Sequence, residues 1–441
     1  MPPKTRTCIV IGAGLAGLSA AHRLKMRGWD VTVFEAQQRV GGRVFSYRFK
    51  EARHLVCELG GEWIGKDHTA MGELCDRFRL KLDRHQYSFS FWNGRKRSRI
   101  YLPSKMKFSA KAQRKFDSYG KQFVNLDYAQ QRFLDQFDWW SVLRSLGFTP
   151  DDLVKRDLMD STDFGESIRL TSAYTAAAEY FESNSTDEMD FKIRGGNDQL
   201  AYSLVSTLDP DRIYLQTKVR SIEQTSSGVK VFVGGRRSPF RAEFCICTVP
   251  AQCLLKIRWK PELPQEQEDA ARQLQYSRIM KTAVLFNKRF WHSDKGFHKG
   301  YGFSAFTTRV SDYCFDSTYL QKGPGGILCS YSIGDKADDL ASEPSRANMK
   351  KWVREDMLGV LGIKGDKTKE IKAIKTQPQA WQRVHWIGGA YAFYRPGQWF
   401  TVRPILQRSH GRVLFAGEHL ADLQGFMEGA VKTGQAAAER L

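Results

Sequence analysis

The start of the chain holds the feature that most restricts its fold, a glycine-rich turn between two apolar runs. The glycines are Gly12, Gly14 and Gly17. Three segments flank them, an apolar β-branched run, a stretch with helical spacing and a second apolar run: Thr7–Ile11, residues 18–26 and Asp30–Phe34. This order predicts a strand–helix–strand unit that begins almost at the first residue.

Each residue type at this turn suits the binding of a dinucleotide. Gly12 permits a tight turn, Gly14 lets the backbone approach a pyrophosphate at the positive end of a helix, and Gly17 lets helix and strand pack closely. Glu35 ends the second strand, where its carboxylate can accept both ribose hydroxyls. An acidic side chain at this position disfavours a 2′-phosphate. The segment therefore predicts a nucleotide cofactor.

A second glycine motif, RVGGR at residues 39–43, follows Glu35 directly. The run from residue 9 to residue 43 resembles the flavin-containing amine oxidase superfamily, in its L-amino-acid oxidase and monoamine oxidase branch. In that family the second glycine motif and its arginine, here Arg43, complete the site for the FAD diphosphate. The resemblance implies FAD as the cofactor, in preference to NAD.

Further motifs of that family follow in the same order: LGGEWIG at 59–65, RGGND at 194–198, TVP at 248–250, LFAGEH at 414–419 and GFMEGAV at 425–431. The resemblance implies that residues 60–63 and 425–428 border the flavin ring, that the Val219 backbone meets the adenine and that Glu418 faces the ribityl and phosphate region. The candidate cofactor-binding residues are Gly12, Gly14, Leu15, Ala16, Gly17, Glu35, Ala36, Arg43, Gly60, Gly61, Glu62, Trp63, Val219, Gly417, Glu418, Gly425, Phe426 and Met427.

Lys281 is the candidate catalytic residue. It lies in an apolar stretch at residues 279–283, where a cation without a partner is costly. Its place ahead of the Phe290-Trp291 pair matches the family lysine that holds a water against flavin N5. A lysine with a lowered pKa there could take up a proton or assist flavin reoxidation. The alternative is a surface lysine whose stem lies along apolar side chains.

Tyr391 and Phe426 match the two family positions that form an aromatic cage over the flavin. Aromatic faces can orient an amine and exclude water. Together with Gly425 and Trp63 they are the candidate substrate-binding residues.

Two positions depart from relatives within the family. Ala390 stands where mitochondrial monoamine oxidases carry a flavin-linking cysteine, so the resemblance implies that FAD is held without a covalent bond. Trp63 stands where secreted L-amino-acid oxidases place a carboxylate-binding arginine. Another group must then bind a substrate carboxylate, and the sequence offers Arg95, Arg97 and Arg169 as candidates.

The charge of the chain is strongly basic, with 68 Lys and Arg against 48 Asp and Glu and a formal net charge of +20. Such a balance can attract nucleic acid, an anionic membrane or an acidic small molecule. No nucleic-acid-binding module is recognisable, so we favour the steering of a carboxylate-bearing substrate and expect no nucleic-acid partner.

The cysteines and apolar runs bear on location and metals. The eight cysteines form no CxxC pair and have mostly apolar neighbours, so we expect buried free thiols and no metal site. No run approaches the roughly 18 apolar residues needed to cross a bilayer, and the first seven residues are too polar for a signal peptide. We therefore expect a cytoplasmic protein without a membrane partner, and leave a homodimer open.

The predicted fold is α/β, with a Rossmann-type, glutathione-reductase-like FAD domain, an α+β substrate domain and a helical insertion. We assign residues 1–65, 194–275 and 405–441 to the FAD domain, 66–100 and 276–404 to the substrate domain, and 101–193 to the insertion. Predicted helices include residues 70–78, 123–137, 139–146, one starting at 149–152 and 425–441. Predicted strands include 212–215, Gly228–Val233, 244–249, 283–286, Gly326–Ile333 and 388–394.

These features predict an FAD-dependent oxidase, with an α-amino acid as substrate, as in L-amino-acid oxidases. Hydride transfer from Cα to flavin N5 would give an imine that hydrolyses to a 2-oxo acid and ammonia, and dioxygen would be reduced to hydrogen peroxide. A monoamine or polyamine oxidase is the first alternative, which Trp63 and the missing arginine would suit. A basic flavoprotein associated with chromatin or RNA is the second.

Overall fold

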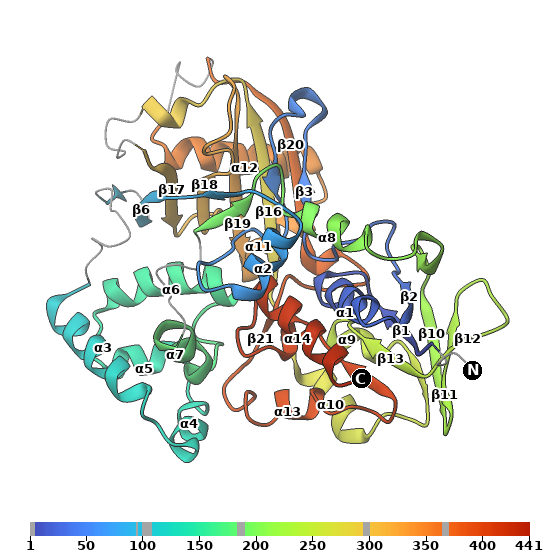
Figure 1. Cartoon of the computed structure of the whole chain (residues 1–441). Coiled ribbons are helices and arrows are strands. Elements are labelled where there is room, and N and C mark those ends of the chain that lie inside the picture. Colours follow the sequence, from blue (N-terminus) through green and yellow to red (C-terminus); the bar gives the residue numbers. More distant parts are fainter. Residues whose placement is uncertain (1–4, 94–95, 99–107, 183–189, 294–299, 364–369) are drawn as a thin grey trace.

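The computed structural model describes residues 5–93, 96–98, 108–182, 190–293, 300–363 and 370–441. A parallel five-stranded sheet contains the glycine turn, with strand order β22-β13-β1-β2-β9. Its strands are β1 (Thr7–Ile11), β2 (Asp30–Phe34), β9 (Ile213–Tyr214), β13 (Phe244–Cys247) and β22 (Val413–Phe415). These strands come from three stretches that are far apart in the chain, residues 7–34, 213–247 and 413–415, so the sheet is assembled from separate segments (Figure 1).

Two helices lie side by side against this sheet, α1 (Leu15–Met26) and α14 (Met427–Glu439). A Cβ built on Gly434 would lie 2.1 Å from the Ala16 carbonyl oxygen, so only glycine allows this approach. The small residues of the last helix therefore let it lie close to α1. A second sheet lies beside the first, with order β12-β11-β10-β14: β10 (Val219–Thr225), β11 (Gly228–Val233), β12 (Phe240–Ala242) and β14 (Arg258–Lys260).

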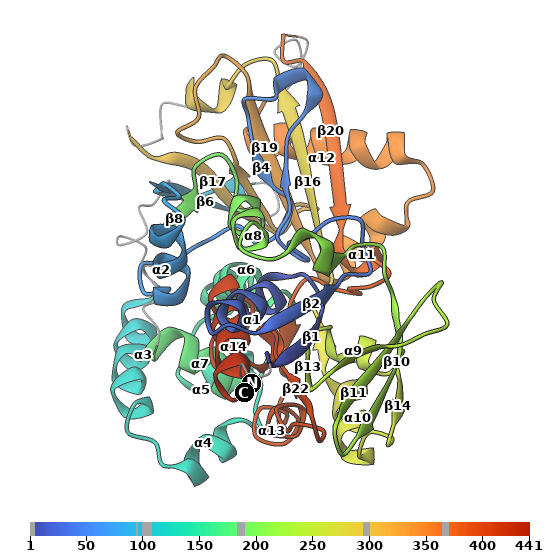
Figure 2. The ribbon, with the colours of Figure 1, turned by 45° about the vertical axis from the view of Figure 1, so that its right-hand side comes forward.

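A seven-stranded sheet stands above the parallel sheet in Figures 1 and 2. Its order is β20-β16-β19-β18-β17-β6-β7, and all neighbours are antiparallel except β17 and β6. The strands are β6 (Tyr87–Asn93), β7 (Lys96–Arg97), β16 (Ile279–Phe286), β17 (Gly302–Thr307), β18 (Tyr313–Asp316), β19 (Gly326–Ile333) and β20 (Ala373–Ala380). Helices α11 (Gly334–Ser342) and α12 (Arg346–Val360) cover one face.

The third part is a group of helices at the lower left of both views. They are α3 (Ala110–Phe123), α4 (Tyr128–Leu134), α5 (Trp139–Ser145), α6 (Pro150–Phe164) and α7 (Ala173–Phe181). All of them fall within the stretch predicted to be a helical insertion. The start of α6 is capped by Thr149, whose Oγ1 accepts from the Asp152 N–H, as the sequence of that turn predicts.

Two predicted elements are wrong in extent. Residues 123–137 form no single helix, because Asp127 caps the start of α4 and makes a capping box with Gln130, which ends one helix and begins another. Residues 388–394 were expected to be a strand, but only β21 (Ala392–Phe393) pairs. Gly388 has φ +76°, so the chain there turns instead of extending.

The strands β11 and β19 have the predicted bounds. All eight cysteines are buried and free, as expected from their apolar neighbours. Within the described ranges, no helix has the length and apolarity needed to cross a membrane.

Candidate active site

A long cavity runs from the glycine turn to the seven-stranded sheet, with a volume of about 1940 Å³ including its open mouth. It joins the glycine turn to Lys281 on the seven-stranded sheet, so an elongated ligand can lie along it and contact both ends. Nearly all of the candidate site residues line it: Gly12, Gly14, Leu15, Ala16, Glu35, Ala36, Arg43, Gly60, Gly61, Glu62, Trp63, Val219, Lys281, Tyr391, Gly417, Glu418, Gly425, Phe426 and Met427.

Gly17 is the candidate residue that does not line the cavity. A Cβ built on it would lie 1.9 Å from the Gly12 carbonyl oxygen, so its role is to let α1 meet the turn. Gly14 caps α1 without a side-chain hydrogen bond, which leaves the first N–H groups of the helix available to an anion. A Cβ on Gly14 would meet only the Gly42 Cα, at 3.9 Å.

The second glycine motif packs directly against the first. Gly41 donates its N–H to the Ala13 carbonyl at 2.8 Å and forms a bridge with Gly14. The Glu35 carboxylate accepts from the N–H groups of Ala13 and Gln37, both at 2.8 Å. These contacts fix the carboxylate at the cavity wall beside the turn, and the geometry fits a nucleotide whose diphosphate lies at the start of α1.

Arg43 and Glu418 form an ion pair in the middle of the cavity, with 2.7 Å between Nη1 and Oε2. Arg43 also donates to the Ala390 carbonyl at 2.7 Å, and Glu418 Oε1 accepts from the Ala392 N–H at 2.8 Å. The pair therefore ties the second glycine motif to the loop that carries Tyr391, so the two walls of the cavity are held together at this point.

Lys281 lies buried at the far end of the cavity, with 5% of its surface exposed. Its Nζ is 2.6 Å from Glu62 Oε2 and donates to the Gly60 carbonyl at 2.9 Å. The interpretation of Lys281 as a surface lysine is therefore wrong, because the side chain is enclosed and has a charged partner. Asn197 holds that partner in place by donating to the Glu62 carbonyl at 2.8 Å.

The protonation expected for Lys281 needs correction. Burial alone would lower the pKa of Lys281, but the negative charge of Glu62 outweighs it and the pKa lies above its ordinary value. A lysine with a lowered pKa is therefore not what this site contains. Lys281 carries a positive charge at neutral pH and can act as a hydrogen-bond donor.

The walls around Lys281 are aromatic, and most of them come from the seven-stranded sheet. Lys281 pairs with Tyr331 across β16 and β19, and Tyr331 pairs with Tyr313 across β19 and β18, so the three side chains form one row on the same face. Phe315 adds a ring two residues after Tyr313, and Trp63 packs on it with ring centroids 5.9 Å apart. Such walls exclude water from the end of the cavity.

Tyr391 completes this wall and is held by two hydrogen bonds. Its hydroxyl donates to the Thr162 carbonyl at 2.6 Å and lies 2.9 Å from the Tyr331 hydroxyl. Thr162 belongs to α6, so the helical insertion also contributes to the cavity. Gly425 has φ +82° and lies against Tyr391, where a Cβ would be 3.5 Å from Cδ2.

Several cavity residues were not identified from the sequence: Thr162, Asp163, Tyr313, Phe315 and Tyr331. The alternation in Tyr313-Cys314-Phe315 is a signal for one wall of a strand, but it does not tell which side of the sheet meets the cavity. That side is set by the pairing of β18 with β19.

The candidates for a carboxylate-binding arginine do not meet the cavity where they are described. Arg169 is exposed and stacks on Trp140, with its guanidinium carbon 3.4 Å from the ring centroid. Arg95 and the side chain of Arg97 lie outside the described residues. Among the described lining residues, Arg43 is the sole arginine, and it is paired with Glu418.

A family model and known relatives match nearly the whole chain. The family model of flavin-containing amine oxidoreductases matches residues 15–441. The L-amino-acid oxidase of Siganus canaliculatus is 28% identical over 98% of this chain and 84% of that protein. An L-amino-acid oxidase of Crotalus adamanteus is 26% identical over 98% of this chain and 86% of its own length.

Solved structures of amine oxidases share the fold. Putrescine oxidase with putrescine bound matches with a TM-score of 0.85 at 23% identity, covering 99% of this chain and 98% of that one. Cyclohexylamine oxidase from Brevibacterium oxydans matches with a TM-score of 0.83 at 20% identity, with coverage of 99% and 98%. Because the family match extends over nearly all of a chain whose cavity joins the glycine turn to a buried lysine, the protein belongs to the flavin-containing amine oxidoreductases and is an FAD-dependent enzyme.

Proposed function

We propose that the protein oxidises an α-amino acid, of the L series, to the 2-oxo acid and ammonia, with dioxygen reduced to hydrogen peroxide. The observation that carries the proposal is the buried Lys281–Glu62 pair at the aromatic end of the cavity. Relatives named L-amino-acid oxidase that align with 98% of the chain support the substrate class. When bound, FAD supplies the acceptor for the two electrons that leave the substrate carbon.

The residues of the chain have separate parts in this proposal. Glu35 and the N-terminus of α1 bind the nucleotide end of FAD, and Arg43 with Glu418 bind its middle. Tyr391, Phe426 and the aromatic wall orient the amine and keep water away from the reacting carbon. Lys281 holds a charged donor at the Gly60 carbonyl, where it can position a water or move a proton.

A screen of peroxide release with matched substrates tests the substrate class. The purified protein is given L-phenylalanine, D-phenylalanine and phenethylamine, and then L-lysine and cadaverine, which differ within each set only in configuration or in the carboxylate. We expect L-phenylalanine to exceed D-phenylalanine, and both L-amino acids to exceed their matched amines, at least tenfold in kcat/KM. Equal turnover of both enantiomers, or no turnover of any amino acid, would contradict the proposal.

A simple amine is the second candidate substrate, and one observation favours it. The arginine among the described lining residues is already paired with Glu418, so a substrate carboxylate has no free guanidinium there. In the same screen, an amine oxidase would turn over phenethylamine or cadaverine faster than the corresponding amino acid.

A cytoplasmic location is a further part of the proposal. Eight cysteines that are all buried and free support a reducing compartment, since thiols stay reduced in the cytosol. Fractionation of cells that express the tagged protein tests the location, and sedimentation of the purified protein tests whether it forms a homodimer.

A further inference from the structure

A second buried lysine, Lys192, lies on the other side of the carboxylate that partners Lys281. Lys192 is on β8 (Phe191–Ile193), and its Nζ is 2.5 Å from Glu62 Oε1. The Nζ of Lys281 is 2.6 Å from the other carboxylate oxygen, Glu62 Oε2. The side chains of Lys192, Glu62 and Lys281 are 8%, 2% and 6% exposed. One carboxylate thus bridges two enclosed lysines, which we name the Lys–Glu–Lys cluster.

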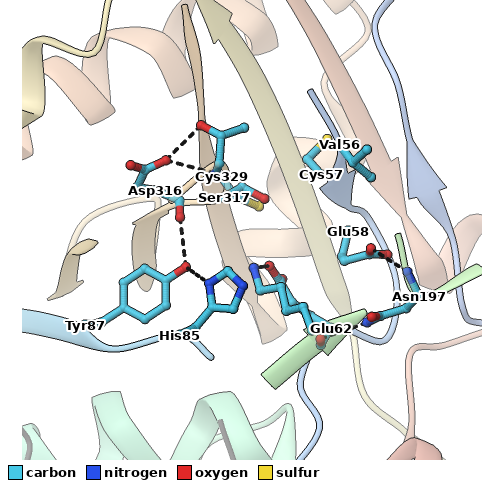
Figure 3. Close-up of polar contacts among 12 residues, drawn as sticks. Val56, Cys57, Glu58, Glu62, His85, Tyr87, Asn197, Asp316, Ser317 and Cys329 are labelled. Atoms are coloured by element: carbon cyan, nitrogen blue, oxygen red, sulfur yellow. Dashed lines mark hydrogen bonds and ion pairs between the residues drawn. The ribbon is translucent and has the colours of Figure 1, made fainter. Parts of the chain in front are cut away.

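Two titratable side chains, His85 and Glu58, lie next to this cluster. His85 stays neutral because burial and the charge of Lys192 lower its pKa to about 2. Burial raises the pKa of the nearby Glu58 carboxyl to about 7, and that carboxyl accepts from the Ser46 hydroxyl and the Asn197 N–H. Figure 3 shows Glu62 with Glu58 and Asn197 on one side and His85 with Tyr87 on the other.

Three more polar side chains near the cluster are uncharged at neutral pH, the Cys329 thiol and the Tyr331 and Tyr87 hydroxyls. Burial raises the pKa of the Cys329 thiol to about 12, and it also raises the pKa of the Tyr331 and Tyr87 hydroxyls. Counted by formal charge, two lysines and one Glu62 carboxylate leave one positive charge in excess, which Glu58 offsets where it is ionised. Charge in such a dry region acts strongly on its surroundings.

Lys192 contacts two aromatic rings that line the cavity. Its Nζ lies 4.1 Å from the centroid of the Trp63 ring and 5.6 Å from that of Phe315. Both rings line the cavity, whereas Lys192 is not among its described lining residues. The ammonium is therefore behind the aromatic wall, where cation–π contact stabilises it, and it contacts Glu62 and two rings that line the cavity.

We propose that Lys192 is a positioning residue that supplies the excess positive charge of the Lys–Glu–Lys cluster and so raises the affinity of the bound cofactor for electrons. Lys281 alone would be balanced by Glu62, so the second lysine accounts for the net charge. A positive charge behind the wall stabilises the negative charge that a flavin gains on two-electron reduction. The inference rests on FAD as the cofactor and is independent of the substrate class.

The midpoint potential of the bound FAD, measured without any amine, tests this inference. Lys192→Gln keeps a donor for Glu62 but removes the charge, Lys192→Met removes both, and Lys192→Arg keeps the charge. We expect the Gln and Met variants to lower the equilibrium constant for two-electron reduction at least tenfold, which is about 30 mV. Lys192→Arg should stay within threefold of the wild type.

Two further variants complete the test. Lys351→Met removes an exposed lysine on α12 that faces Glu355 at 3.9 Å, and it should leave the potential unchanged. Glu58→Gln, measured at pH 8 where Glu58 is mostly ionised, removes an adjacent negative charge and should shift the potential upwards. This variant keeps the inference testable if the Lys192 variants do not bind FAD.

Three results would overturn the inference. A wild-type potential in Lys192→Gln would show that the charge has no effect. A shift in Lys192→Arg as large as that in Lys192→Gln would assign the effect to packing. An unchanged potential in Glu58→Gln at pH 8 would show that the cluster does not act on the cofactor. Since no substrate enters these measurements, they are independent of whether the protein oxidises amino acids.

Discussion

Lys281 can be replaced without leaving its partner Glu62 unpaired. In Lys281→Met the apolar stem stays, and Glu62 remains paired with Lys192 at 2.5 Å, so no buried carboxylate is left without a cation. We expect a folded protein that retains FAD and loses about 10²–10⁴-fold in flavin reduction or in reoxidation. Stopped-flow measurement of the two half-reactions identifies the affected one, and unchanged rates in both would remove Lys281 from the chemistry.

Ala390 and Cys253 are the cavity residues that bear on a covalent link to FAD. Ala390 has no thiol, and the Cys253 thiol, which also lines the cavity, donates to the Trp386 carbonyl at 3.4 Å. Burial raises the pKa of Cys253, so its reactive thiolate is scarce. We expect acid precipitation to release all of the flavin into the supernatant. Flavin that stays on the denatured chain but is lost from Cys253→Ser would show a link at that cysteine.

At the scale of elements, two glycines of the same turn have different roles, since Gly14 borders the cofactor cavity and Gly17 lets α1 pack against the turn. Gly14→Ala adds a Cβ that meets only the Gly42 Cα at 3.9 Å, whereas Gly17→Ala places one 1.9 Å from the Gly12 carbonyl oxygen. The first variant should fold and bind less FAD, because the added methyl faces the cavity, and the second should fail to fold. Thermal unfolding and the ratio of flavin to protein measure both. Stoichiometric FAD in Gly14→Ala would place the diphosphate elsewhere.

Helix α6 contains two ion pairs of equal spacing and different burial. Arg156 and Asp160 are 6% and 0% exposed, and Lys155 and Asp151 are 25% and 63% exposed. Asp160→Ala leaves a buried guanidinium without its carboxylate, so we expect a loss of about 3–5 kcal/mol in unfolding free energy. Asp151→Ala should cost about 0–1 kcal/mol. Chemical denaturation of both variants tests the difference, and equal losses would contradict it.

At the scale of the whole molecule, buried histidines and carboxyls give opposite dependences of stability on pH. Burial and Lys192 lower the pKa of His85 to about 2. Below pH 6.5 this histidine is therefore protonated in the unfolded chain but not in the native state, so the free energy of unfolding falls as the pH falls. The pKa of Glu58 is raised to about 7, so its contribution to stability is present below pH 4.5 and is lost as the pH rises through 7.

Two variants separate these dependences. His85→Phe should gain stability over the wild type as the pH falls from 6.5 to 5, by about 1.4 kcal/mol per pH unit. Glu58→Gln should gain over the wild type as the pH rises from 5 to 7. Denaturation at several pH values measures both, and parallel pH profiles for wild type and variants would contradict the assigned shifts.

The sequence predicted the parts of the molecule that depend on local pattern. The turn at Gly12 and the bounds of β11 and β19 follow from residue order and apolar runs. Lys192 was not foreseen, because β8 has three residues and its partner Glu62 is far away in the chain. The pKa of Lys281 was predicted in the wrong direction for the same reason. Such features depend on contacts between distant segments.

The hydrogen bond from Tyr391 to the Thr162 carbonyl has a consequence for how proteins of this architecture can diversify. Among the described residues of the helical insertion, only Thr162 and Asp163 border the cavity, while the nucleotide end is built from the parallel sheet and its glycine turns. Sequence changes within the helical insertion can thus alter the end of the cavity that binds the substrate, while the residues that bind FAD stay unchanged. Part of the substrate preference can therefore change without any change in the residues that bind the nucleotide.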